Sequence, residues 1–199
     1  MGRTSDAKQK ILAAARSLIE ARGYSALGVA EICTAAGVPK GSFYHFFASK
    51  EALAIAVVDE HWAAQQRDWA RALGGDAAPL ERLRRLFEET EAAQYAAQEG
   101  CGSVAGCLFG NLTLELSNQT ESVRERLQEI FEAQVGMVES VVAEARERGD
   151  VTVTDAGEAA RAVVAQLEGQ VLFAKLYNDT GRLSPLWPNC RALLGATAA

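Results

Sequence analysis

The sequence has few cysteines, few histidines and no long apolar run, and each shortage excludes a class of protein. Its four cysteines are scattered over 199 residues and form no Cys-x-x-Cys pair. A disulfide framework is therefore not expected, and the thiols are predicted to be free. The two histidines have no second His or Cys at ligand spacing, so we expect no zinc site, no other metal and no cofactor.

Two further shortages concern enzymes and membranes. No nucleophile-base pair, metal cluster or glycine-rich phosphate loop has a recognisable spacing, so the chain is not expected to be an enzyme. No N-terminal apolar run resembles a signal peptide, and no apolar stretch is long enough to cross a bilayer. The sequence thus predicts a soluble, cytoplasmic protein with no membrane partner.

Charge is present but unevenly placed along the chain. The net charge is −6, yet residues 1–50 hold seven Lys and Arg against three Asp and Glu, which makes this segment +4 and the rest −10. A small basic head on an acidic body is typical of a DNA-binding domain joined to a regulatory or assembly domain. We expect a DNA-binding domain over residues 1–48 and a separate regulatory or assembly domain over residues 49–199.

Apolar periodicity predicts helices along the whole chain and no strands. An amphipathic helix is expected over residues 6–21, a short one over 29–36 that stops at Gly37, and a third directly after Pro39. The other expected helices cover residues 49–73, 79–98, 106–117, 118–148, 154–178 and 184–194, with Asn118 and Glu121 spaced as a capping pair. The prediction is an all-α fold of about nine helices, with an N-terminal three-helix helix-turn-helix domain and a C-terminal helical bundle.

The third expected helix has features that suit DNA. Its first turn would present Lys40, Gly41 and Ser42 where main-chain N–H groups are unpaired and the helix dipole is positive. Gly41 would let the main chain approach DNA closely, while Tyr44 and His45 could donate to phosphate oxygens. The alternative is an ordinary amphipathic helix with solvated polar groups; the +4 head favours DNA contact. The phenylalanines at 43, 46 and 47 are expected in the core.

The first quarter of the chain resembles the TetR family of transcriptional regulators. The resemblance implies an all-helical homodimer whose heads bind a palindromic operator and whose C-terminal bundle holds an inducer pocket and the dimer interface. It also implies that residues 40–42 start the recognition helix, that Tyr44 and His45 contact DNA, and that Lys50 reaches a phosphate. One departure is Leu27-Gly28, where members often have a Thr or Ser that caps the second helix. The matching residues are Ile11, Ala14, Gly23, Tyr24, Val29, Ile32, Ala36, Gly37, Val38, Lys40, Gly41, Phe43, Tyr44, Phe46, Lys50, Glu51 and Leu53.

A second likeness covers residues 106–112 and 115–117. It resembles the sixth helix of family members that respond to reactive electrophiles through a cysteine. Cys107 would then be the sensor, with Cys101 as its resolving partner. The alternative is a packed structural cysteine, because burial beside Leu108 and Phe109 would make the thiol inert.

Polar and aromatic side chains of the body are candidates to line a ligand pocket, although core, solvent and the partner subunit are alternatives for each. Small and large apolar residues between Ala162 and Phe173 would let two helices approach closely. This helix and the one over residues 184–194 are therefore expected to form a four-helix dimer interface, with an intramolecular core helix as the alternative. The ligand candidates are Tyr95, Cys107, Asn111, Glu115, Phe131, Gln134, Gln166 and Gln170.

These features together predict a ligand-responsive transcriptional repressor. A small-molecule or thiol-reactive inducer would release it from a palindromic operator in double-stranded DNA. The two heads of the homodimer would lie about one helical turn apart, roughly 34 to 36 Å. The alternative is a constitutive DNA-binding protein without an inducer, because its head would look the same.

Overall fold

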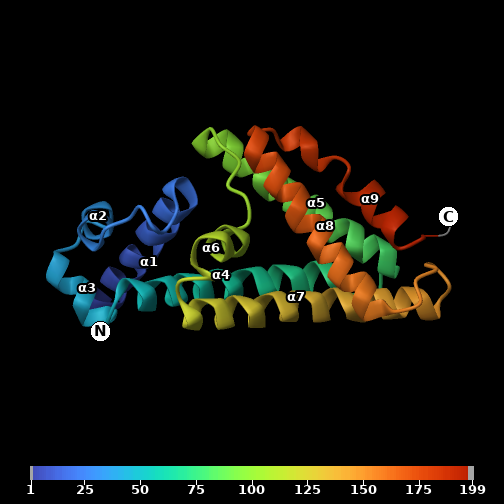
Figure 1. Ribbon diagram of the computed structural model, residues 1–199, viewed down its shortest axis with the longest axis horizontal. Coiled ribbons are helices and arrows are strands. Elements are labelled where there is room, and N and C mark those ends of the chain that lie inside the picture. The colour runs from blue at the N-terminus through green and yellow to red at the C-terminus, as the bar shows by residue number, and fades with distance from the viewer. Residues whose placement is uncertain (1, 197–199) are drawn as a thin grey trace. The chain divides into compact units, whose positions relative to one another are not determined.

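The computed structural model describes residues 2–196, with side chains described from residue 6 onward, and the chain divides into two compact units. The first unit comprises residues up to 63 together with 108–128, and the second comprises 64–107 and the residues from 129 onward. Over the described range the elements are helical, with no strand, which confirms the all-α prediction (Figure 1). The elements are α1 (Gly2–Arg22), α2 (Val29–Ala35), α3 (Lys40–Phe46), α4 (Lys50–Leu73), α5 (Pro79–Cys101), α6 (Leu108–Leu116), α7 (Glu121–Glu147), α8 (Ala156–Tyr177), the 3-10 helix η1 (Thr180–Leu183) and α9 (Leu186–Leu193).

The first unit is organised around α1. Ile11, Ala15 and Ile19 recur every four residues on one face of this helix and are buried, as an amphipathic helix requires. Both α2 and α3 pack on α1, and α6 contacts it as well (Figure 1). The grouping of α6 with the head follows from these contacts. The predicted boundary between residues 48 and 49 concerns the DNA-binding function and stays a prediction.

The second unit has its own apolar core, built by the end of α4, by α5, by most of α7, and by α8 and α9. In α8 the buried side chains include Ala160, Leu167 and Val171, while η1 and α9 pack against the same helix. The α8 ends are defined locally. Asp155 accepts a hydrogen bond from the Glu158 N–H at 3.0 Å as the N-cap, and the left-handed Asn178 closes the C-terminal end.

The turn between α6 and α7 corrects one local prediction. Because α7 begins at Glu121, Asn118 is not its N-cap. The residues after Leu116 instead fold back on α6, since the N–H groups of Gln119 and Thr120 donate to Leu116 O at 2.9 and 3.0 Å. These main-chain bonds, together with the Gln119 side-chain amide that donates to Glu115 O at 2.8 Å, satisfy the carbonyl groups at the end of α6. The other predicted helix ends differ from those observed by up to four residues.

Candidate nucleic-acid interface and sensor residues

A glycine turn fixes the angle between α2 and α3. Gly37 has φ +65°, in the left-handed region that glycine adopts without strain. Its N–H donates to Thr34 O at 3.1 Å, and the Val38 N–H donates to Cys33 O at 3.0 Å. This pair of bonds is a Schellman motif, which closes α2. Pro39 then serves as the N-cap of α3, so the two helices follow each other across a tight turn, as the sequence predicts.

The start of α2 has no side-chain cap. Gly28 is the N-cap, in an extended conformation, and its carbonyl accepts the Ile32 N–H at 3.1 Å. Glycine is a tolerable cap, only a few tenths of a kcal/mol poorer than a hydroxyl residue. The departure noted at Leu27-Gly28 therefore leaves α2 intact, and its N-terminus offers main-chain N–H groups in place of a hydroxyl.

The two faces of α3 differ sharply. Phe43 is fully buried and Phe47 nearly so, with ring centroids 5.6 Å apart. Phe46, also expected in the core, is half-buried. On the opposite face Tyr44 is 59% exposed, and its ring meets the edge of Phe43 with centroids 5.2 Å apart. The aromatic core thus holds α3 while its outer face is free to contact a partner. The predicted DNA contacts on α3 are exposed at Lys40, Gly41, Tyr44 and His45 and half-buried at Ser42.

Gly41 has no packing reason to be glycine. A Cβ built at this position would meet no atom of the described residues within 4 Å, and the residue lies in regular helix. Glycine in a helix costs roughly 0.5 to 1 kcal/mol relative to alanine. The open space above the first turn of α3 is what a close main-chain approach to another molecule needs.

Lys50 lies against the loop between α1 and α2. Its Nζ donates to Tyr24 O at 3.1 Å and to Leu27 O at 2.9 Å, and it lies 4.0 Å from the centre of the Tyr24 ring. Burial lowers the pKa of Lys50, and the nearby Glu115 carboxylate opposes that shift. Two of the three ammonium protons are therefore used within the head, which leaves one for the predicted phosphate contact.

Glu115, a predicted ligand candidate, has its carboxylate in the same loop. One oxygen accepts the Tyr24 N–H at 3.1 Å and the other accepts the Ser25 N–H at 2.9 Å. The neighbouring Gly23 has φ +80°, and a Cβ there would lie 2.5 Å from the same carboxylate. Glycine suits this position mainly for its backbone angle, and a larger residue would also have to displace the Glu115 carboxylate.

His61 on α4 is a titratable group that the sequence did not single out. Its ring centroid lies 5.1 Å from that of Phe109, and its Nδ1 is buried without a hydrogen-bond partner among the described residues. The pKa of His61 is lowered to about 4, mainly by burial and also by the Arg16 charge, while the Glu20 charge opposes the shift. The imidazole is thus neutral at pH 7.

Cys107, the predicted sensor, is half-buried and contacts a carboxyl group. Burial raises the pKa of Glu168 on α8, and a hydrogen bond from the Cys107 thiol opposes that shift. Sequence reasoning missed Glu168. The sequence does mark it in one way, because Glu168 is the one charged residue between Arg161 and Lys175 in a mostly apolar stretch.

The loop that carries Cys107 is held from two helices. The Gln94 amide on α5 both donates to and accepts from the main chain of Gly106, each at 3.0 Å. On α8 Lys175 donates to Ala105 O at 3.0 Å, and Asn178 accepts the Val104 N–H at 2.8 Å. A chemical modification of the Cys107 thiol would therefore act on a loop whose position is fixed by these hydrogen bonds.

The other cysteines separate into exposed and packed groups, and none of the four described cysteines forms a disulfide. Cys101, the last residue of α5, is exposed, as a resolving cysteine requires. Cys33 and Cys190 are buried, and burial raises the pKa of Cys190 to about 12. These two are packing residues.

The ligand candidates are divided between the two units. Asn111 and Glu115 belong to the first unit and the other six to the second. Gln134 is 1% exposed, with Nε2 donating to Gln65 Oε1 at 3.0 Å and Oε1 buried without a partner among the described residues. Gln166 and Gln170 donate to the main chain of α9 and η1. Tyr95 is 53% exposed and Phe131 is half-buried.

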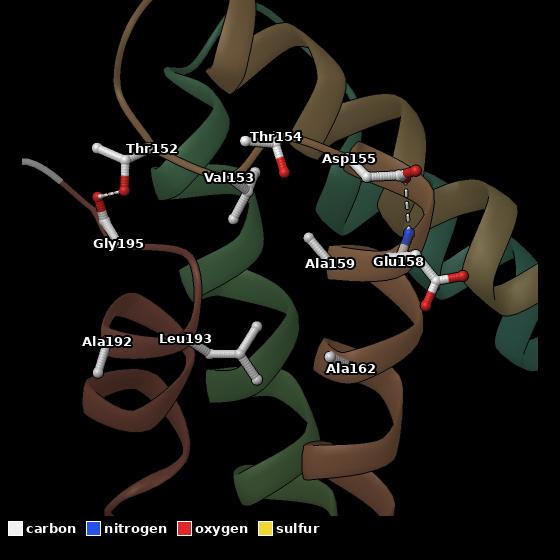
Figure 2. A pocket seen from close by; sticks show the side chains of 10 residues that line it. All are labelled: Thr152, Val153, Thr154, Asp155, Glu158, Ala159, Ala162, Ala192, Leu193 and Gly195. Atoms are coloured by element: carbon white, nitrogen blue, oxygen red, sulfur yellow. Dashed lines mark hydrogen bonds between the residues drawn. The ribbon is translucent and has the colours of Figure 1, made fainter.

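An open pocket of about 600 Å³ lies elsewhere in the second unit, between the α7–α8 loop, the start of α8 and α9 (Figure 2). Asp155 and Glu158 line one side, and Asp155 is already the N-cap of α8. Thr152 closes the other side through a hydrogen bond to Gly195 O at 3.3 Å. None of the predicted ligand residues lines this pocket.

Residues 2–196 lack two kinds of feature. Within this range no helix is both long and apolar enough to cross a membrane. The same residues contain no group of three or more His, Cys, Asp or Glu side chains placed to hold a metal ion.

Comparisons with known proteins cover both units. The sequence matches "Bacterial regulatory proteins, tetR family" over residues 11–57 and "Tetracyclin repressor-like, C-terminal domain" over residues 79–187. The HTH-type transcriptional repressor DhaR of Mycobacterium sp. (strain GP1) is 36% identical over 78% of this chain and 75% of its own. The transcriptional regulator AcuR of Cereibacter sphaeroides is 35% identical over 85% and 77%. The crystal structure of the reduced form of Escherichia coli NemR matches with a TM-score of 0.85 and 26% identity, over 98% of this chain and 100% of that one.

Proposed function

The chain belongs to the TetR family of DNA-binding transcriptional regulators, and we propose that it represses transcription at a palindromic operator until a small-molecule or thiol-reactive inducer releases it. Regulators of this family are not enzymes. The observation that carries the proposal is the outer face of α3. Tyr44 and His45 are exposed there, while Phe43 and Phe47 hold the helix in the core from the other side.

The contacts with DNA divide into two kinds. Lys40 at the start of α3 and the remaining N–H donor of Lys50 suit phosphate oxygens. Such ionic contacts give an affinity that falls as the salt concentration rises. Gly41 lets the main chain come close to DNA, and Tyr44 and His45 carry the hydrogen-bonding groups that fix the position of α3. Ser42, half-buried on the first turn, adds a hydroxyl beside them.

A second copy of the chain is the proposed partner for α8. Four large apolar side chains of this helix are at least half exposed, which is unusual for a surface that stays in water. A palindromic operator needs two heads related by a two-fold axis, and a homodimer through α8 and α9 would supply them. The four side chains are Leu172 at 50%, Phe173 at 53%, Leu176 at 70% and Tyr177 at 55% exposure.

Two observations in the second unit support an inducer. The buried Oε1 of Gln134 has no partner among the described residues, and such an acceptor is costly unless a donor reaches it. A ligand with an N–H or O–H group would satisfy it. Cys107 offers the thiol-reactive route, because hydrogen peroxide would transfer one oxygen to its sulfur, giving a sulfenic acid and one water, and so replace the S–H donor that contacts Glu168. The related NemR was solved in a form described as reduced.

Selection of genomic fragments by the purified protein tests the repressor proposal. It predicts recovery of a palindromic site whose binding is lost on addition of an inducer. The genes beside that site indicate small molecules to try, and hydrogen peroxide and N-ethylmaleimide test the thiol route. If no member of this panel changes the affinity, the protein is the constitutive DNA-binding alternative.

A further inference from the structure

We propose that Glu115 is a positioning residue for operator binding, because its carboxylate holds the α1–α2 loop and so sets the place of the helix-turn-helix relative to α6. The same contact passes a movement of α6 to the head. That second statement rests on the proposed inducer response, whereas the first depends on DNA binding alone.

The contact joins parts of the chain that are far apart in sequence. Glu115 accepts the Tyr24 N–H at 3.1 Å and the Ser25 N–H at 2.9 Å, across 91 and 90 residues. A carboxylate that accepts two main-chain N–H groups forms charge-assisted hydrogen bonds, which are about twice as strong as neutral ones. Glu115 is the one charged residue of α6. No other side chain of α6 can therefore make a charge-assisted contact with the loop if Glu115 is replaced.

The loop is shaped to receive this carboxylate. Gly23 turns the chain at φ +80°, and any side chain there would begin 2.5 Å from the Glu115 oxygen. On the carbonyl side Lys50 donates to Tyr24 O and Leu27 O. An anion therefore holds the N–H groups of the loop and a cation holds its C=O groups, which leaves the loop little freedom to shift.

What the loop determines is the start of the helix-turn-helix. Leu27 is buried, and the next residue, Gly28, is the N-cap of α2. Because the Schellman turn fixes α3 on α2, a displacement of the loop moves both helices together. At its other end α6 begins at Leu108, directly after Cys107. The chain thus leads from the sensor residue through one short helix to the loop.

Neutralising Glu115 changes operator affinity in opposite directions for a positioning role and for a purely electrostatic one. Removing a negative charge from a DNA-binding head should strengthen binding to phosphates. If Glu115 instead positions the loop, its neutralisation should weaken operator binding. The matched control is Glu125, an exposed carboxylate of α7 in the same unit, for which only the electrostatic effect is expected.

The experiment compares wild type, Glu115→Gln, Glu115→Ala and Glu125→Gln on an operator fragment recovered from the genomic selection. Expected are affinities about tenfold lower for Glu115→Gln and lower again for Glu115→Ala, since one charge-assisted bond corresponds to about that factor. Glu125→Gln should bind as wild type or more tightly. Equal or tighter binding by both Glu115 variants would overturn the proposal.

Two further measurements exclude a general loss of structure. Hydrogen exchange should speed up at the Tyr24 and Ser25 amides in both Glu115 variants while the amides of α1 and α3 keep their protection; uniform loss of protection would overturn the positioning role. The second measurement is the ratio of operator affinities with and without N-ethylmaleimide. If this ratio is smaller in Glu115→Gln than in wild type, the result supports transmission through the Glu115 contact. If the two ratios are equal, transmission through this contact is overturned. A wild type that ignores the reagent refutes the thiol route alone, because the reagent-free affinities still test Glu115.

Discussion

The thiol of Cys107 donates a hydrogen bond to the carboxyl group of Glu168, in a loop held by α5 and α8. The pair joins the predicted sensor to an acidic group that is mostly withdrawn from water. A thiolate beside a carboxylate is disfavoured by Coulomb repulsion, so we expect Glu168 to slow the reaction of Cys107 with oxidants and electrophiles. Whether Cys107 is inert or reactive thus depends on Glu168.

Glu168→Gln is predicted to make Cys107 react about tenfold faster with N-ethylmaleimide, because the amide still accepts the thiol hydrogen bond but repels no thiolate. Mass spectrometry of the peptide that contains Cys107 measures the rate separately from Cys101. Glu158→Gln, at an exposed carboxylate on the same helix, is the control and should leave the rate unchanged. Equal rates in both variants would show that Glu168 does not restrain the thiol.

His61→Phe is predicted to remove part of the acid sensitivity of the fold. The folded pKa of His61 is about 4 against an ordinary 6.5, so the unfolded chain takes up a proton first as the pH falls. Stability is then lost between pH 6.5 and 4, by at most about 3 kcal/mol. Urea unfolding of wild type and variant across this range measures the difference.

The phenylalanine should also pack against Phe109 and remove the unpartnered buried nitrogen, so no loss of stability is expected at pH 7. His45→Gln is the control, since His45 is exposed and is the other histidine of the chain. It should keep the wild-type pH dependence. A His61→Phe protein with the same pH dependence as wild type contradicts the assignment.

Leu176→Glu is predicted to give a monomer that no longer binds a palindromic operator, because a charge in an apolar interface is left unpaired. Leu114→Glu is the matched control: Leu114 is 76% exposed on α6 and Leu176 is 70% exposed on α8. Sedimentation or light scattering measures the mass, with dimers expected for wild type and the control. A dimeric Leu176→Glu protein would exclude α8 as the interface.

Gly41→Ala is predicted to stabilise the fold by up to about 1 kcal/mol, because alanine is the better helix former and meets no atom within 4 Å. The same change should weaken operator binding if the main chain approaches DNA there. Gly136→Ala, at an exposed glycine of α7 with equal free space, should stabilise the fold without affecting binding. A Gly41→Ala protein that binds like wild type would remove the close-approach argument.

The sequence predicts local features of this fold well and distant contacts poorly. The turn at Gly37 and the position of α3 after Pro39 follow from residues within one or two helical turns, so periodicity and caps suffice to find them. The contacts of Glu115 with the α1–α2 loop span about 90 residues, and nothing local marks them. The sequence predicts Glu115 as a ligand residue because it is polar on an apolar helix, and that stays a prediction; the sequence does not reveal its contacts with the loop, nor does it single out Glu168.

Asn118 shows a different limit. Its spacing to Glu121 fits a capping pair, but main-chain bonds to Leu116 close the preceding helix and move the start of α7 to Glu121. Capping patterns compete with the turn that comes before them, and the sequence alone does not decide between the two.

The most direct test of the account measures operator affinity at several salt concentrations for wild type, Lys40→Ala, Tyr44→Ala and Lys10→Ala. Lys10 is an exposed lysine of the same unit, paired with Asp6 at 2.7 Å, and serves as the control. Lys40→Ala should lose about tenfold in affinity and reduce the salt slope by about one, and Tyr44→Ala should lose a similar factor with the slope kept. Wild-type affinity in both α3 variants, with the dimer intact, would contradict the claim that the outer face of α3 binds the operator.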